Sequence, residues 1–221
     1  MTICNGKSKK HYSIEYSSCH EASHALARAA NGDELVYVDA LQRIVTFKSK
    51  DWNCPCGGFL KVLDEGFRFN FNPDCKSCDL KLTNLLSANY AGAAATAILM
   101  PEEHDPQDAE SDYAAAAEFV APYRDALEKW GELTLTAQHE ADEMVKQSAT
   151  TILNLRNAIV RAGGRLDGPC AHQIIDSLSE PSGSPKRQTS RRKRVTVLLM
   201  ATLCLSVLLL AAINRLTKAE L

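Results

Sequence analysis

The most constraining feature of this sequence is an apolar run near its C-terminal end. Residues 195–213 (VTVLLMATLCLSVLLLAAI) contain no charged side chain over 19 positions. As a helix with a rise of ~1.5 Å per residue, this run would span about 28 Å, close to the ~30 Å hydrocarbon core of a bilayer. It also lacks the polar face that a buried helix of a globular protein normally shows. The sequence therefore predicts one transmembrane helix, following a folded body at residues 1–179.

The charges that flank this run predict how it would be oriented. Six Lys and Arg residues precede it within residues 186–194, whereas only Arg215 and Lys218 follow it. Basic flanks are retained in the cytoplasm. We therefore expect a single-pass membrane protein that is anchored by its C-terminal helix and keeps its N-terminal domain in the cytoplasm. Residues 180–194 are predicted to be a basic linker, and residues 214–221 a short tail.

The charge of the body argues against nucleic-acid binding, and the absence of a phosphate-loop motif argues against ATP hydrolysis of that type. Residues 1–185 have a net charge of −9, and residues 186–221 have a net charge of +7. An acidic body is not the electrostatic footprint of a nucleic-acid-binding protein, so no nucleic-acid partner is expected. The sequence contains no GxxxxGK phosphate loop, so ATP dependence is not encoded in this chain.

The body is predicted to be mainly α-helical with a small β component. Apolar positions recur at helical spacing from residue 12 until Asn31-Gly32, which is a helix stop signal. Residues 34–47 are rich in Val, Ile, Tyr and Phe, which favours a strand. The helices are expected at residues 12–30, 80–100, 111–129, 134–162 and 168–178.

The first predicted helix carries the motif His20-Glu21-Ala22-Ser23-His24, an HExxH sequence. Residues four apart lie on one face of a helix, so both imidazoles can bind one Zn²⁺ at ~2.0–2.1 Å. Glu21 beside the first ligand is then placed to act as a general base. The alternative is two surface histidines with no ligand. A catalytic zinc needs a third protein ligand, and composition alone does not choose among His104, Asp105, Asp108, Glu110 and Asp112.

Three sequence blocks together resemble the peptidase domain of FtsH-type membrane zinc metalloproteases. They are SCHEASHALARAANGDELVYVDALQR, LLSANYAGAAATAILMPEEHDPQDAESDYAAAAEFV and ILNLRNAIVRAGGRLDGPCAHQII. The resemblance implies a helical zincin-type peptidase domain at residues 1–179. In that family an Asp of a Ser-Asp pair is the third zinc ligand, which implies Asp112 here. The ATPase domain of that family does not occur in this sequence, so an ATPase or unfoldase would have to act in trans.

Two cysteine pairs predict a second metal site. Cys54 and Cys56 precede, and Cys75 and Cys78 follow, a stretch that alternates like a β-hairpin. A hairpin that brings two pairs together can form a tetrahedral thiolate site for a structural zinc. Two disulfides or four reduced thiols are the alternatives, and a reducing cytosol disfavours the disulfides. Residues 51–79 are therefore expected to form a zinc-ribbon-like insert.

The function expected from the sequence is a membrane-anchored zinc metalloendopeptidase. His20, His24 and Asp112 would hold the catalytic zinc, and Glu21 would be the general base. Its partners would be unfolded or flexible polypeptide substrates and a membrane. The alternative function is a catalytically inactive, zinc-binding adaptor that presents its four-cysteine insert to a membrane partner.

Overall fold

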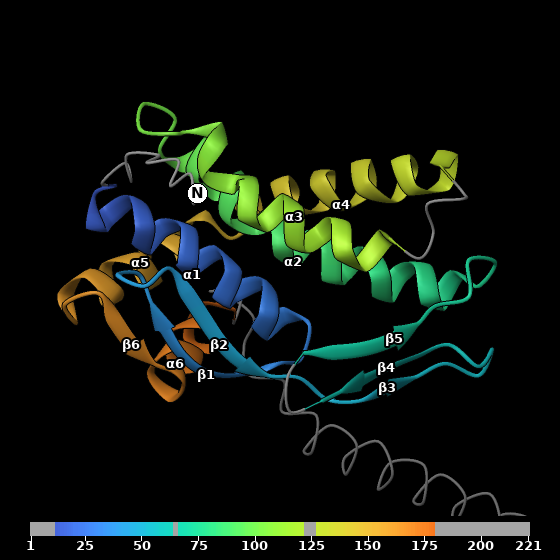
Figure 1. Cartoon of the computed structure of the whole chain (residues 1–221). Helices are drawn as coiled ribbons and strands as arrows, with labels where there is room; N and C mark the ends of the chain where they lie inside the picture. Colours follow the sequence, from blue (N-terminus) through green and yellow to red (C-terminus); the bar gives the residue numbers. More distant parts are fainter. Residues whose placement is uncertain (1–11, 64–65, 122–126, 180–221) are drawn as a thin grey trace, which may run out of the picture. The chain divides into compact units, whose positions relative to one another are not determined.

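The computed structural model of the chain describes residues 12–63, 66–121 and 127–179 (Figure 1). Six α-helices and a short 3₁₀ helix form most of this part. The α-helices are α1 (Ile14–Ala30), α2 (Lys76–Leu99), α3 (Glu110–Val120), α4 (Leu127–Gln147), α5 (Ala149–Arg161) and α6 (Gly168–Ser179), and the 3₁₀ helix is η1 (Pro106–Ala109).

Two small antiparallel sheets complete the body. The first has the order β2–β1–β6 and consists of β1 (Glu34–Asp39), β2 (Ile44–Lys48) and β6 (Arg165–Asp167). The second has the order β3–β4–β5 and consists of β3 (Trp52–Asn53), β4 (Phe59–Val62) and β5 (Phe67–Asn70). The second sheet contains the hairpin that the cysteine-bearing insert predicts.

Helix α2 lies at the centre of the body, because it packs against α1 on one side and α4 on another (Figure 1). Residues 91–97 of α2 (AGAAATA) are all Ala, Gly or Thr, and most of them are buried. Such small side chains let neighbouring helices approach α2 closely. Helix α1 packs in turn against α5 and against strand β1. The HExxH segment is therefore held between several elements, and not on a free helix face.

Helix α1 begins where its sequence provides a cap. The Ser13 side chain accepts a hydrogen bond of 3.0 Å from the backbone N–H of Tyr16, which satisfies one of the free donors of the first turn. The helix ends at Ala30, before Asn31 and Gly32. Gly32 has a φ of +82°, a conformation that costs glycine little. The predicted helix 12–30 is thus close to the helix in the structure.

Two predicted elements are divided in the structure. The single strand expected at residues 34–47 is an antiparallel pair, because the Asp39 side chain accepts hydrogen bonds from the N–H groups of Leu41 and Gln42 and so makes a turn. The helix expected at 134–162 consists of α4 and α5, which meet at Ser148. Strand β6 was not predicted, since three residues carry no readable alternation.

The predicted membrane helix and the location inferred from it must be corrected. Within residues 12–63, 66–121 and 127–179, no helix is both long and apolar enough to cross a bilayer. Helix α2 has the necessary length at 24 residues, but it bears Lys76, Asp79 and Lys81 near its start. Residues 195–213, and the linker and tail that flank them, lie outside the described residues. The fold that the structure supports for the described residues is a mainly helical body with two small antiparallel sheets.

Candidate metal centres

The two histidines of the HExxH segment lie one turn apart on α1, and the structure brings Asp112 to them from the first turn of α3. The Nε2 atom of His20 is 3.1 Å from Nε2 of His24. Oδ2 of Asp112 lies 2.9 Å from Nε2 of His20 and 3.3 Å from Nε2 of His24. Tetrahedral ligands at ~2.0–2.1 Å from one Zn²⁺ would be about 3.3 Å apart. The three observed distances therefore suit three ligands of a single ion.

A glycine of α2 creates the space for this cluster. A Cβ atom on Gly92 would lie 2.4 Å from Nε2 of His20 and 2.5 Å from Nε2 of His24. Contacts that short do not occur between real side chains, so no residue larger than glycine fits without moving the rings. The backbone of α2 therefore forms one wall of the cluster, next to the Nε2 atoms of both imidazoles.

The other ring nitrogen of His24 has a fixed partner. Nδ1 lies 2.8 Å from the carbonyl oxygen of Ala88. A carbonyl can only accept, so this contact places the proton on Nδ1 and leaves the Nε2 lone pair directed at the cluster. Such a contact orients a metal ligand before the ion binds.

His20 faces a buried ion pair on its other side. Its Nδ1 is 3.7 Å from Oδ2 of Asp108 and has no hydrogen-bond partner within the described residues. The Asp108 carboxylate is itself held by both terminal nitrogens of Arg43, one of them at 2.7 Å. Arg43 is the one non-glycine residue of the described part with a positive φ, at 57°. The Arg43 side chain, from the β1–β2 turn, thus binds the Asp108 carboxylate and holds it beside His20.

The charges of the cluster are strongly coupled. Burial opposes ionisation of Asp112, but hydrogen bonds from His20 and His24 hold the pKa of Asp112 well below its usual range. Burial alone would lower the pKa of His24, whereas the hydrogen bond to Asp112 and the charge of that carboxylate raise it overall. In the absence of metal, their contact therefore favours the protonated form of His24 and the ionised form of Asp112.

Glu21 is buried beside this pair, with 3% of its surface exposed. Burial raises its pKa, and the nearby charges of His24, His20 and Arg43 act in the opposite direction. A raised pKa makes this carboxylate a stronger base than an exposed glutamate.

The other candidates for a third ligand make contacts elsewhere. His104 Nδ1 lies 3.1 Å from the Thr96 hydroxyl, and the Asp105 side chain caps η1 through the N–H of Gln107. Asp108 faces Arg43, and Glu110 starts α3 two residues before Asp112. Only Asp112 among these five residues joins the two histidines within 4.8 Å.

The four cysteines of the insert form a second cluster that could hold a metal ion. Sγ of Cys54 lies 3.6 Å from Sγ of Cys75, and Sγ of Cys56 lies 3.4 Å from Sγ of Cys78. All four sulfur atoms lie within 4.8 Å of one another. Tetrahedral thiolates at ~2.3 Å from Zn²⁺ would be about 3.8 Å apart, so the spacing suits one ion. None of the cysteines in the described residues forms a disulfide.

The end of β3 and the start of α2 build this second cluster. Cys54 and Cys56 follow β3, Cys75 is the N-cap residue of α2, and Cys78 lies in its first turn. The backbone N–H of Cys78 donates toward the Cys75 sulfur and lowers the pKa of that thiol to about 7. Gly58 leaves room for the Cys78 sulfur, since a Cβ there would lie 2.5 Å from it.

The two clusters are separate because they contact opposite parts of α2. Gly92 follows Cys78 by fourteen positions, which is about 21 Å along a helix at ~1.5 Å per residue. No ligand is shared, so each cluster can be altered without removing a ligand from the other.

Sequence reasoning missed Gly92 and Arg43, and it considered Asp108 only as a possible third ligand, not as the partner of Arg43. Gly92 stands in an Ala-rich run, where glycine weakens a helix and therefore signals a close contact. Asp108 and Arg43 carry no local signal, because their pairing joins residues 65 positions apart.

No model of a known protein family matches this chain, and no curated protein matches it. The resemblance to FtsH-type peptidases therefore remains a prediction that rests on the three sequence blocks.

Proposed function

We propose that this protein is a zinc metallopeptidase whose active site is the cluster of His20, His24 and Asp112. The observation that carries the proposal is the convergence of their three ligand atoms at 2.9–3.3 Å beside the buried Glu21. Two histidines, one carboxylate and an open fourth position are the ligand set of a catalytic zinc, whereas structural zinc sites are closed by four protein ligands.

Glu21 is the general base in this proposal. Zinc held by the three ligands would supply Lewis acidity and lower the pKa of a bound water to about 7. Glu21 would accept a proton from the attacking water and deliver it to the amine that leaves when the peptide bond breaks. Arg43 and Asp108 keep His20 in place, and the Ala88 carbonyl does the same for His24.

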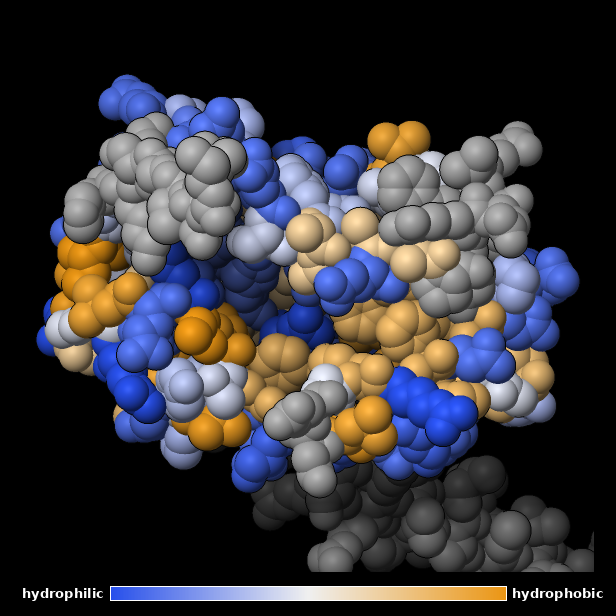
Figure 2. All heavy atoms as spheres, in the orientation of Figure 1, coloured by the Kyte–Doolittle hydropathy of each residue, from blue (hydrophilic) through white to orange (hydrophobic). Residues whose placement is uncertain are grey.

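Partial exposure makes the proposed centre reachable. The side chains of His24 and Asp112 are 13% and 17% exposed, whereas that of His20 is 3% exposed. The face drawn in Figure 2 is hollowed near its centre, and hydrophilic residues lie at the bottom of the hollow. An open polar site of this kind suits hydrolysis better than a permanently closed structural site.

Strand β2 is a suitable place for an extended substrate. It is an edge strand, because β1 pairs with it on one side only. It begins directly after Arg43, whose side chain reaches Asp108 next to His20. A polypeptide pairing with this edge would be held by main-chain hydrogen bonds close to the metal cluster. Only an unfolded or flexible segment can pair in this way, so unfolded chains are the proposed substrates.

For the four-cysteine cluster we propose a structural zinc. Four protein ligands leave no open position for substrate or water, and a small hairpin buries too little apolar area to be stable alone. The ion would fix the β3–β5 sheet onto the start of α2.

The decisive experiment compares wild type with Glu21→Gln on an unfolded casein-like substrate, with zinc present. Wild type is expected to cleave without ATP, and Glu21→Gln is expected to bind zinc equally well but not to cleave. Glu140→Gln is the matched control, because His139-Glu140 begins the sequence HEADE, which lacks the second histidine. It should remain active. Equal behaviour of wild type and Glu21→Gln on every unfolded substrate would refute the peptidase and favour the adaptor.

A further inference from the structure

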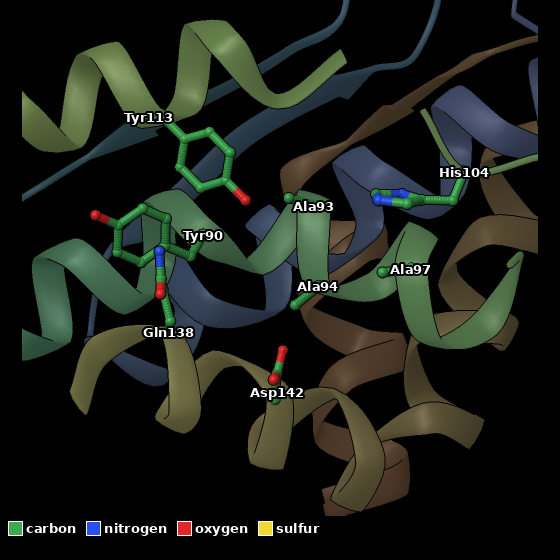
Figure 3. Close-up of a pocket in the computed structure, with 8 residues that line it drawn as sticks. All are labelled: Tyr90, Ala93, Ala94, Ala97, His104, Tyr113, Gln138 and Asp142. Carbon is green, nitrogen blue, oxygen red and sulfur yellow. The ribbon is translucent and has the colours of Figure 1, made fainter. Parts of the chain in front are cut away.

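A cavity of about 230 Å³ lies beside the proposed active site, between α2, α4 and the start of α3 (Figure 3). We call it the side pocket. Its wall includes Ala93 and Tyr113, and these are the chain neighbours of Gly92 and Asp112. The side pocket is therefore adjacent to the metal cluster along two different helices. The cavity is smaller than the ~300–1,000 Å³ typical of sites for drug-sized ligands, so it suits a single amino-acid side chain.

The side pocket has an apolar floor and an aromatic rim. Ala93, Ala94 and Ala97 of α2 form the floor, and the rings of Tyr90 and Tyr113 stand at one end with their centroids 5.4 Å apart. Figure 3 shows the Tyr113 hydroxyl and the His104 ring directed toward the space above the alanines. A linear aliphatic chain can lie along such a floor, and a cation can lie over the aromatic faces.

The opposite wall carries one carboxylate, that of Asp142 on α4. Its oxygen atoms point into the side pocket toward Ala94, and the Gln138 side chain lies one turn earlier on the same helix (Figure 3). Within the part of the chain that the structure describes, no donor contacts this carboxylate at hydrogen-bond or ion-pair distance. Lys146, one turn further along α4, pairs with Glu143 at 2.9 Å and also interacts with Asp142 through its charge. Asp142 is the one acidic side chain among the described residues that line the side pocket.

The charge of Asp142 acts on Tyr113, on the other side of the side pocket. Burial raises the pKa of Tyr113, and the negative charges of Asp112 and Asp142 raise it further. Tyr113 therefore lies within electrostatic range of both carboxylates.

From this arrangement we infer that the side pocket receives a lysine or arginine side chain of the substrate next to the scissile bond. The aliphatic stem would cover the alanine floor, and the cationic head would donate hydrogen bonds to the Asp142 carboxylate and the Gln138 side-chain oxygen. A glutamate or aspartate would be repelled there, and a leucine or norleucine would leave the Asp142 charge unpaired. This inference rests on the proposed peptidase function, which it extends to a substrate class.

The test uses two capped heptapeptides, Ala-Ala-Ala-X-Ala-Ala-Ala, in which X is lysine or norleucine. Norleucine matches the lysine stem but lacks its charge. Binding is measured by calorimetry on zinc-loaded Glu21→Gln protein, so that no cleavage intervenes. We expect the lysine peptide to bind at least about tenfold more tightly, since a hydrogen bond to a charged group is worth about that factor or more. Adding Asp142→Asn should reduce this ratio to within about twofold.

Asp176→Asn is the matched control for loss of one carboxylate. Asp176 is exposed on α6 and does not line the side pocket, so the tenfold ratio should persist. The same peptide pair is then used as substrate for wild type, Asp142→Asn and Asp176→Asn, and the kcat/KM ratio of lysine to norleucine should follow the binding ratio.

The two readouts separate the side-pocket inference from the peptidase proposal. If wild type cleaves neither peptide and no unfolded protein, but the binding ratio depends on Asp142, the peptidase proposal is wrong and the side pocket still recognises a cation. If the lysine peptide binds no better than the norleucine peptide, or if the ratio survives Asp142→Asn, the side-pocket inference is wrong, whatever the cleavage assay shows.

Discussion

Replacing Gly92 with alanine should remove the ion from the histidine cluster while leaving the fold largely intact. The added Cβ would lie 2.4–2.6 Å from three atoms of the His20 and His24 rings. Ordinary contacts are about 3.5–4.0 Å, so the rings or the α2 backbone must retreat by about 1 Å. Metal–ligand distances tolerate only ~0.2 Å. Two of the three ligands would therefore be displaced, and we expect zinc affinity to fall at least about 100-fold.

The effect of Gly92→Ala on folding should be much smaller. Overpacking costs about 1–3 kcal/mol, and alanine in place of a helical glycine returns about 1 kcal/mol. The metal-free variant should thus be less stable than wild type by about 0–2 kcal/mol in urea unfolding. Gly131→Ala is the matched control, since Gly131 lies in α4 with no atom within 4 Å of the added Cβ. It should bind zinc normally.

Zinc content is measured by elemental analysis, and affinity by competition with a chromophoric chelator. The four-cysteine cluster provides an internal reference, because it should keep its ion in both glycine variants. If Gly92→Ala retained the full zinc content at unchanged affinity, the ion would not be bound by the ring faces that contact Gly92, and the proposed ligand set would be wrong.

Two further substitutions test the surroundings of the sites. Asp108→Asn should weaken zinc binding about 10- to 100-fold in the chelator competition, because it removes the charge that faces Nδ1 of His20; unchanged affinity would mean that Asp108 does not position this ligand. Cys78→Ser should release the second ion and lower the free energy of unfolding by about 4 kcal/mol when free zinc is about 1,000-fold above Kd. The control Cys170→Ser alters an exposed thiol outside the cluster, and equal stability of the two serine variants would contradict a structural zinc.

Local features of the sequence were enough to predict the parts of the sites that lie on one element. The spacing of His20 and His24 is a property of a single helix turn, and the cysteine pairs flank a hairpin whose alternation is visible in the sequence. The structure accordingly has α1 at Ile14–Ala30 and the β4–β5 hairpin between the two cysteine pairs. In both cases, residues close in sequence determine the geometry.

Contacts between distant elements could not be predicted in this way. The pairing of β6 with β1 places Asp39 opposite Arg165, and a strand of three residues is too short to show a pattern that would predict this pairing. Asp112 is selected from five suitable downstream residues only by the family resemblance. Whether Asp112 or Asp108 reaches the Nε2 atoms of both histidines depends on how η1 and α3 pack over α2, which is a tertiary property.

The cluster of His20, His24 and Asp112 also predicts opposite effects of pH on the metal-free protein and on metal binding. Without metal, the pKa of His24 is raised and that of Asp112 is lowered by their contact. A raised histidine pKa stabilises the fold fully below the unfolded value of about 6.5, and this contribution is lost as pH rises through the folded value. The lowered Asp112 pKa contributes above the unfolded value of about 3.9 and is lost in stronger acid.

The pair therefore stabilises the metal-free protein most between about pH 4 and pH 6.5. Chelator-treated wild type and Asp112→Asn are unfolded in urea from pH 5 to pH 9, and any effect of the empty cysteine cluster cancels in the difference. Wild type should be the more stable near pH 5.5, and its advantage should shrink as pH rises. Zinc needs the neutral imidazole, so its affinity in the acid range should rise by about tenfold per pH unit for the proton it displaces. A wild-type advantage that grew toward pH 9 would show that His24 and Asp112 do not form this pair, and a zinc affinity independent of pH would show that the ion does not displace its proton.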